Sequence, residues 1–139
     1  MKRFNFWQKW LLVFGVITIF MGVIVACLSF MGIEISYINA AFWENGVVPP
    51  AAKGFQVWIY GTYGAMTIVF GLFVVFIAKN SFKKKEKWAW NCLIICFSLW
   101  FAIDTFFSVY AKMYTNVLNN FVFFVLLMLP LIFTKKHFK

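Results

Sequence analysis

Charged residues are scarce in this sequence, and acidic ones are the scarcest. Only 12% of the 139 residues are charged, with 4 Asp and Glu against 13 Lys and Arg. A soluble domain carries about 25% charged residues and about 45–50% apolar residues. This composition excludes a disordered chain and argues against a cytosolic enzyme, whose surface needs charged side chains.

The residues that most often carry catalysis, redox chemistry or metal binding are also few. The chain has 1 His and 3 Cys. His137 lies in the C-terminal tail, which excludes histidine haem ligation and histidine acid–base chemistry within the apolar runs. Cys92 and Cys96 share a helix face and Cys27 lies towards the opposite membrane surface, so we expect no disulfide between them. The sequence singles out no catalytic residue, no metal site and no cofactor.

Long apolar runs dominate the chain instead. Hydrophobic residues make up 64% of it, aromatic residues 23%, and the mean hydropathy is +0.86. A helix needs about 20 apolar residues to cross roughly 30 Å of hydrocarbon, where the backbone must satisfy its own hydrogen bonds. Four runs are long enough: residues 10–33, 54–78, 88–111 and 113–134. We predict one all-α domain over residues 1–139, a polytopic integral membrane four-helix bundle.

Basic residues predict the orientation of this bundle. Eleven of them flank the first span, the connection between the second and third spans, or the end of the fourth: Lys2, Arg3, Lys9, Lys79, Lys83, Lys84, Lys85, Lys87, Lys135, Lys136 and Lys139. Lys53 and Lys112 flank the other ends. The positive-inside rule therefore places both termini in the cytoplasm, and we expect a multi-pass protein of a bacterial plasma membrane. Such juxtamembrane clusters are typical of contact with anionic membrane lipid and argue against nucleic-acid binding.

The first span contains a sequence that resembles a lipoprotein signal. Residues 24–27 (IVAC) resemble a lipobox, and cleavage before Cys27 would leave a lipidated protein with three spans. Because the apolar run continues to Ile33, we favour an uncleaved span.

The connection between the first two spans, residues 34–53, is the only long one. Residues 36–46 predict a short amphipathic helix with an N-cap at Ser36 and a stop at Gly46. Its apolar face would contain Tyr37, Ile38, Ala41 and Phe42. We expect this helix on the outer membrane surface, followed by an extended stretch over residues 47–50. The loop would either seal the top of the bundle or act as a lid over a binding site.

Two spans share a motif of small residues. Residues 15–22 and 64–71 both match G-x-x-T-I-x-x-G. This spacing places both glycines and the threonine on one helix face, where two helices can approach closely. We expect helix packing. The alternatives are docking of a second copy or a membrane partner on the Gly15/Gly22 and Gly64/Gly71 faces, and a remnant of the inverted symmetry found in transporters.

One charged residue interrupts a predicted span. Asp104 lies roughly 10 Å below the outer end of the third span, at 1.5 Å per residue. A charged group in hydrocarbon costs several kcal/mol, so such residues usually face the protein interior beside a partner. Trp100, Asp104 and Ser108 share one helix face. Asn116 and Asn120 share a face of the fourth span at a similar depth.

Polar residues of the spans gather in the outer half, which predicts a polar pocket open to the outside and closed below. We hypothesise that Asp104 anchors a small amphipathic or lipid-like molecule, that the two asparagines orient it, and that aromatic side chains form the walls. The predicted ligand-binding residues are Asp104, Asn116, Asn120, Trp100, Ser108 and Tyr63.

The polar cluster allows other interpretations. It could fix the register of the helices without binding a ligand, or belong to an ion or proton path, although the inner half offers no ionisable group to continue one. A carboxylate-dependent membrane enzyme would need Glu34 or Glu44 within about 5 Å of Asp104. A structural or interaction subunit of a membrane complex is the remaining alternative.

Three segments support a family resemblance: residues 88–90 (WAW), 100–105 (WFAIDT) and 116–120 (NVLNN). With the four-span plan, they resemble small four-helix bacterial membrane proteins of the DoxX-like type, a resemblance that implies the fold and brings no established activity. The plan is also similar to the EXPERA proteins, which bind sterol-like ligands beside intramembrane acids. Their catalytic histidine has no counterpart within these spans.

Overall fold

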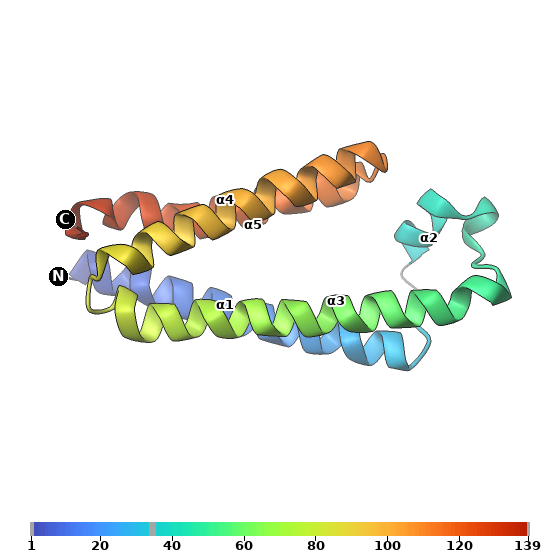
Figure 1. The fold of residues 1–139 in the computed structure, drawn as a ribbon, viewed down its shortest axis with the longest axis horizontal. Helices are drawn as coiled ribbons and strands as arrows, with labels where there is room; N and C mark the ends of the chain where they lie inside the picture. The colour runs from blue at the N-terminus through green and yellow to red at the C-terminus, as the bar shows by residue number, and fades with distance from the viewer. Residues whose placement is uncertain (1, 34–35, 139) are drawn as a thin grey trace. The chain divides into compact units, whose positions relative to one another are not determined.

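The computed structural model describes residues 2–33 and 36–138, and these residues form helices and turns. In chain order the helices are α1 (Lys2–Phe30), α2 (Ser36–Phe42), η1 (Glu44–Gly46), α3 (Pro50–Ile77), η2 (Ala78–Phe82), α4 (Lys87–Tyr110), α5 (Tyr114–Thr134) and η3 (Lys135–His137) (Figure 1). Four of them, α1, α3, α4 and α5, are long and apolar enough to cross a membrane. The predicted all-α fold with four spans is thereby confirmed.

The chain divides into two compact units. The first contains Met1–Val16 and Phe73–Lys139, and the second contains Ile17–Leu72. The first unit therefore includes the start of α1 and the hairpin of α4 and α5, and the second includes α2, η1 and most of α3. That both units form a single four-helix bundle stays a prediction, as do the placement of the termini in the cytoplasm and the type of membrane.

Large apolar side chains cover the outside of all four long helices. Phe20 on α1, Met66 on α3, Phe106 on α4 and Phe121 on α5 are each more than half exposed. Extensive apolar surface of this kind is rare on a soluble monomer, whereas in a bilayer it contacts hydrocarbon. Helix length, hydropathy and surface thus agree on a multi-pass membrane protein.

Helix α1 ends at Phe30, three residues before the predicted end of the span. Gly32 adopts a φ of 68°, in the left-handed region that glycine enters without a steric penalty. The Ile33 amide donates to the Leu28 carbonyl at 2.9 Å and the Gly32 amide to the Ser29 carbonyl at 3.0 Å. This is a Schellman motif, which satisfies the last carbonyl groups of the helix.

The same motif closes the turn between α4 and α5, here with a lysine in the left-handed position. Lys112 has a φ of 59°, and the Met113 amide donates to the Ser108 carbonyl at 2.7 Å. This connection is short, in keeping with the prediction that residues 34–53 form the only long one. It makes α4 and α5 antiparallel neighbours within the first unit (Figure 1).

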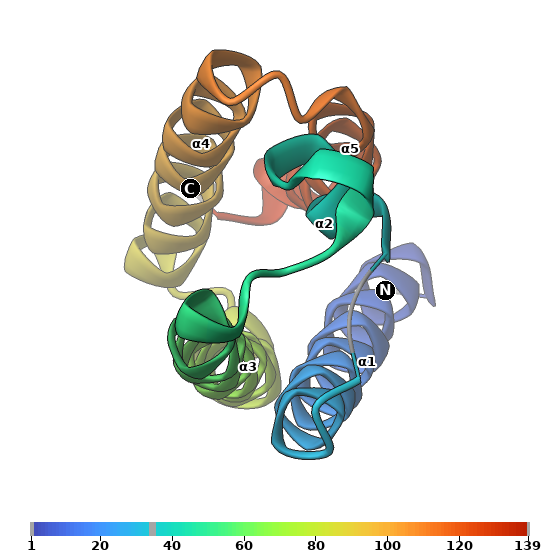
Figure 2. The same cartoon turned by 90° about the vertical axis from the view of Figure 1, so that its right-hand side faces the viewer.

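The predicted amphipathic helix over residues 36–46 is shorter than expected. Helix α2 ends at Phe42, because the next residue, Trp43, has an extended backbone. The short η1 follows, and within it Asn45 adopts a left-handed φ of 56°. The side chains of Ser36 and Tyr37, including the predicted N-cap, lie outside the described residues. Of the predicted extended stretch over residues 47–50, Val47 has an extended backbone and residues 47–49 are not helical, but Pro50 already begins α3 (Figure 2). A proline fits this first helical position because the amide hydrogen that it lacks has no helical partner there.

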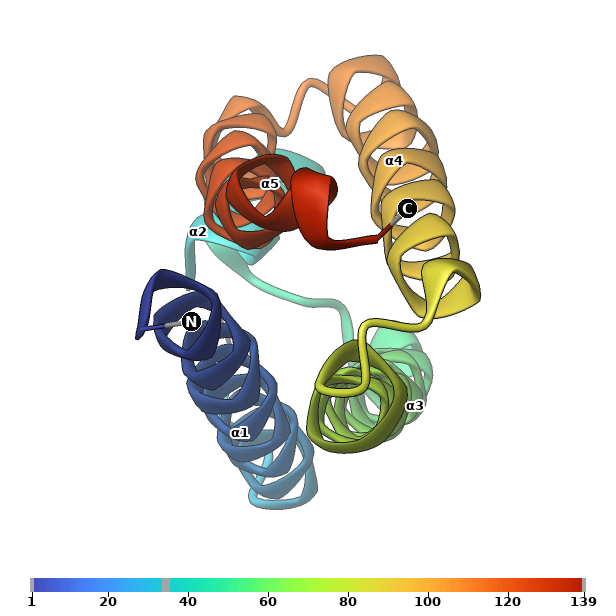
Figure 3. The ribbon, with the colours of Figure 1, turned by 90° about the vertical axis from the view of Figure 1, so that its left-hand side faces the viewer.

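Each unit has its own packed interior. In the first, the start of α1 and η3 lie at the end of the unit that faces the viewer in Figure 3. An aromatic cluster joins this part of α1 to η2 and to the residue after η3, since the Phe4 ring centroid lies 5.8 Å from that of Phe82 and 5.9 Å from that of Phe138. In the second, Gly22 and Gly64 bring α1 and α3 together so closely that a Cβ on Gly22 would lie 2.7 Å from the Gly64 carbonyl oxygen. The predicted helix packing is thereby confirmed for Gly22 and Gly64, and for Gly15 and Gly71 it stays a prediction.

Candidate functional site

The hairpin of α4 and α5 brings three of the predicted site residues together. Asp104 and Ser108 lie one turn apart on α4, and Asn116 lies in the first turn of α5. Because the turn at Lys112 is so short, the last turns of α4 lie beside the first turns of α5. The polar side chains of both helices therefore occupy the same end of the hairpin.

Hydrogen bonds connect these three residues. The Asn116 Nδ2 group donates to Ser108 Oγ at 2.8 Å and to Asp104 Oδ2 at 3.4 Å. The Ser108 hydroxyl donates to the Asp104 backbone carbonyl at 2.7 Å. Ser108 is buried, while Asp104 and Asn116 are half-buried. The Ser108 hydroxyl thus both donates and accepts a hydrogen bond, whereas the Asp104 carboxyl receives one long hydrogen bond among the described residues.

Asn120 has a different partner from the one its spacing predicts. It is buried, and its Nδ2 group donates to Thr105 Oγ1 at 3.4 Å. Thr105 was missed as a site residue, although its position next to Asp104 in a strongly apolar span is a signal for it. The pair extends the polar cluster one turn deeper along α5 than Asn116 does.

The two predicted aromatic walls lie in different units. Trp100 is half-buried on α4, one turn before Asp104. Tyr63 lies on α3 in the second unit, and 60% of its side chain is exposed. Its part in a pocket with Asp104 stays a prediction. Of the two glutamates that the enzyme alternative needs, Glu44 belongs to the second unit and Glu34 lies outside the described residues.

The loop between α1 and α3 is anchored to α3 within the second unit. Asn39 on α2 is 1% exposed and accepts a hydrogen bond from the Gln56 side chain. Nearby, Gln56 and Tyr60 line a small groove of about 200 Å³, with Ser29 and Lys53 among its other residues. Helix α2 is therefore held through Asn39, whereas Phe42 of its predicted apolar face is 54% exposed. A lid function of this loop stays a prediction.

Reactive residues do not gather elsewhere in the described part of the chain. Within residues 2–33 and 36–138, no three His, Cys, Asp or Glu side chains lie close enough to hold a metal ion. Cys92 and Cys96 do share a face of α4, with their Sγ atoms 4.0 Å apart, and both are free thiols, as is Cys27. The polar cluster around Asp104 thus offers hydrogen bonding and one carboxyl group.

Comparison with known proteins identifies no family. No protein-family model, no curated protein and no solved structure matches the chain. The resemblance to DoxX-like and EXPERA proteins therefore stays a prediction. What is established is a small membrane protein with four transmembrane-length helices.

Proposed function

We propose that this membrane protein binds a small amphipathic or lipid-like molecule, whose polar group contacts Asp104 at the end of the α4–α5 hairpin. The observation that supports the proposal is the incomplete hydrogen bonding of Asp104. Its carboxyl group lies in an apolar helix and receives one bond of 3.4 Å from Asn116, whose shorter bond of 2.8 Å goes to Ser108. A carboxyl group can accept several more hydrogen bonds than this.

A ligand with a hydrogen-bond donor would provide the Asp104 carboxyl group with hydrogen bonds that the protein does not supply. Intramembrane acidic residues are costly and usually mark a binding site or a transport path. Asn116 would hold the carboxyl in place, and Trp100, one turn away, would contact the apolar part of the ligand. Asn120 would act indirectly, because its bond to Thr105 fixes α5 against α4.

The proposal is tested by the molecules that co-purify with the protein in a mild detergent. Lipid-like molecules would be extracted from the wild type and from the Asp104→Asn and Asn116→Ala variants, and then identified by mass spectrometry. We expect a molecule that is stoichiometric in the wild type and depleted about tenfold or more in both variants, since a polar group left without its hydrogen-bond partner costs about 1–3 kcal/mol.

Asn119→Ala is the matched control, because Asn119 is exposed on α5 between the two asparagines of the cluster. It should retain the molecule at the wild-type level. If Asp104→Asn lowers only the thermal stability and the same molecules are recovered in the same amounts, the proposal is wrong. The cluster would then serve to fix the register of α4 and α5.

A further inference from the structure

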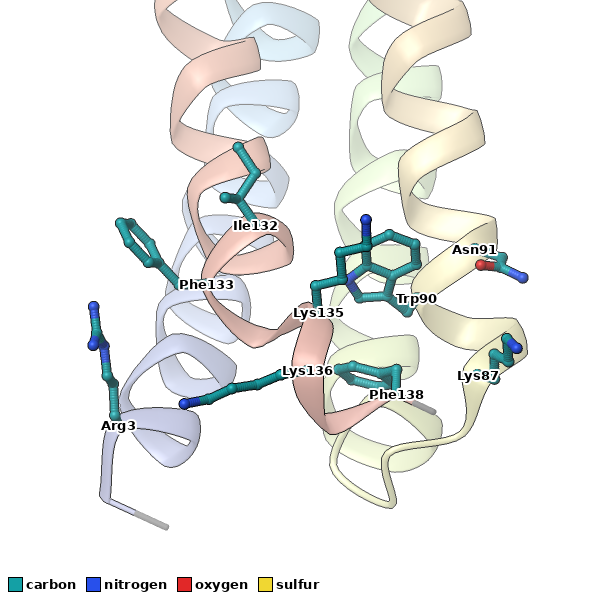
Figure 4. Close-up of a pocket in the computed structure, with 9 residues that line it drawn as sticks. All are labelled: Arg3, Lys87, Trp90, Asn91, Ile132, Phe133, Lys135, Lys136 and Phe138. Atoms are coloured by element: carbon teal, nitrogen blue, oxygen red, sulfur yellow. The ribbon is translucent and has the colours of Figure 1, made fainter.

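A second candidate site, separate from Asp104, lies where α1 begins and α5 ends. It is an open groove of about 850 Å³ within the first unit, lined by residues of α1, α4, α5 and η3 (Figure 4). Four cationic residues contribute to its lining: Arg3, Lys87, Lys135 and Lys136. The sequence explains these residues as an orientation signal and does not predict that they meet around one cavity.

Aromatic rings position two of the four cations. The Arg3 Cζ atom lies 5.2 Å from the ring centroid of Phe133, and the Lys135 Nζ atom lies 6.0 Å from the ring centroid of Trp90. The Trp90 indole is itself fixed, because its Nε1 group donates to the Leu131 carbonyl at 2.9 Å. A cation over an aromatic face is held electrostatically and keeps its N–H groups available for an anion.

The groove belongs to a packed part of the unit. Phe138, which lines it, is 6% exposed, and its ring centroid lies 4.7 Å from that of Phe82. Phe4 stacks on the same Phe82 ring, so the start of α1 packs against the Phe82 and Phe138 pair. The two cations that lie over aromatic rings, Arg3 and Lys135, are therefore attached to a packed part of the unit.

The charge of the groove is uncompensated among the residues that line it. Its described lining contains no acidic side chain. The nearest acid along the chain from Lys87 is Glu86, whose Oε2 atom already accepts a hydrogen bond from Trp88 Nε1 at 2.6 Å. Four positive charges around one cavity attract a negatively charged ligand, and phosphate oxygens are the acceptors that arginine and lysine bind best.

The position of the groove favours a lipid over a free anion. Ile132 is 61% exposed and Phe133 is 41% exposed, and both lie on the last turns of the apolar helix α5 directly beside the cations. A phospholipid has the same order of groups, a charged phosphate followed by apolar chains. Basic pockets at the ends of transmembrane helices are typical binding sites for anionic headgroups.

We propose that this groove binds an anionic phospholipid, with the phosphate beside Arg3 and Lys136 and an acyl chain along Ile132 and Phe133, while Lys135 and Lys87 line the groove farther along (Figure 4). The lipid would connect the start of α1 to the start of α4 and the end of α5 from the membrane side. This site does not depend on the ligand proposed for Asp104.

The test measures lipid binding to the full chain in an uncharged detergent by native mass spectrometry. The probes are phosphatidylglycerol and phosphatidylcholine with identical acyl chains, and inorganic phosphate as competitor. The groove variant carries Arg3→Gln, Lys135→Gln and Lys136→Gln. The control variant carries Lys79→Gln, Lys83→Gln and Lys84→Gln, which removes the same charge from exposed lysines outside the groove.

We expect phosphatidylglycerol to bind the wild type and the control alike, and the groove variant about tenfold or more weakly, because each juxtamembrane cation strengthens binding to anionic lipid. A further variant, Lys135→Arg with Lys136→Arg, should bind like the wild type, which separates loss of charge from loss of folding. Equal weakening in the groove and control variants would overturn the proposal, as would equal binding of phosphatidylcholine. Full displacement of the lipid by inorganic phosphate would assign the groove to a small anion instead.

Discussion

Glu86 closes the turn between η2 and α4, and its surroundings favour the charged form. A hydrogen bond from Ser81, a second from Trp88 and the charge of Lys84 lower the pKa of this carboxyl below its ordinary value of 4.5. Each partner donates a hydrogen or carries a positive charge, and both stabilise a carboxylate over a neutral acid. Glu86 precedes α4, so the carboxylate also lies close to the positive end of the helix dipole.

The lowered pKa gives the turn a defined dependence on pH. A group whose pKa is lower in the folded state stabilises that state above its unfolded pKa, and the contribution is lost as the pH falls through the folded pKa. We expect the carboxyl carbon of Glu86 to titrate below pH 4.5 in an NMR titration of the ¹³C-glutamate-labelled protein in micelles.

The Glu86→Gln variant assigns the Glu86 resonance. The Trp88→Phe variant tests whether the hydrogen bond from Trp88 lowers the pKa of Glu86. Removing the indole donor should move the pKa of Glu86 back towards 4.5, since the hydrogen bond from Trp88 is one of the interactions that lower it. An unchanged pKa in Trp88→Phe would contradict this account of the turn.

At the scale of the helices, the close approach of α1 and α3 in the second unit depends on glycine. A Cβ on Gly22 would lie 2.7 Å from the Gly64 carbonyl oxygen and 2.8 Å from the Ile68 amide nitrogen, both of them backbone atoms. We expect Gly22→Ala to lower the free energy of unfolding by about 1–3 kcal/mol, because the helices must move apart to admit the methyl group. The measurement is unfolding by a denaturing detergent, followed by circular dichroism.

Gly54→Ala is the matched control for this prediction. Gly54 lies in α3, and a Cβ there would meet no atom within 4 Å. Alanine is a better helix former than glycine by about 1 kcal/mol, so this variant should be as stable as the wild type or more stable. If Gly22→Ala and Gly54→Ala changed the stability by the same amount and sign, close packing at Gly22 would not matter.

The spans were predictable because an apolar run of about 20 residues or more crosses a membrane as a helix, in which the backbone satisfies its own hydrogen bonds. The exact residues at which the helices end were not predictable. The end of α1 depends on the left-handed turn at Gly32, and the end of α2 depends on the extended backbone of Trp43. Both are local backbone conformations, and the length of an apolar run does not determine the residue at which they occur.

The polar cluster was predictable only in part, for a geometrical reason. The spacing of Asp104 and Ser108, together with the short turn, predicts Asn116 at the same end of the hairpin, where its side chain hydrogen-bonds to both. The pairing of Asn120 with Thr105 depends on how far α5 is rotated about its own axis, which the spacing leaves open. The basic groove was not predictable, since its cations come from segments far apart in the sequence.

At the scale of the molecule, the structure brings basic segments together at one end of the first unit. Lys85 lies over the Phe4 ring, Arg3 over Phe133 and Lys135 over Trp90, so the start of α1, the turn before α4 and η3 share this end. The positive-inside rule predicts that such an end faces the cytoplasm.

This orientation predicts opposite labelling of two exposed lysine positions, Lys53 and Lys84. In a background with all three cysteines replaced by alanine, a Lys53→Cys variant should react with a membrane-impermeant maleimide in intact cells. A Lys84→Cys variant should react only after the membrane is permeabilised.

Replacing Lys53 removes one of the two basic residues on the predicted outer side, so the charge difference that sets the orientation becomes larger. The reverse labelling pattern would place the basic groove on the outer side, and labelling of both variants in intact cells would mean that the chain inserts in both orientations.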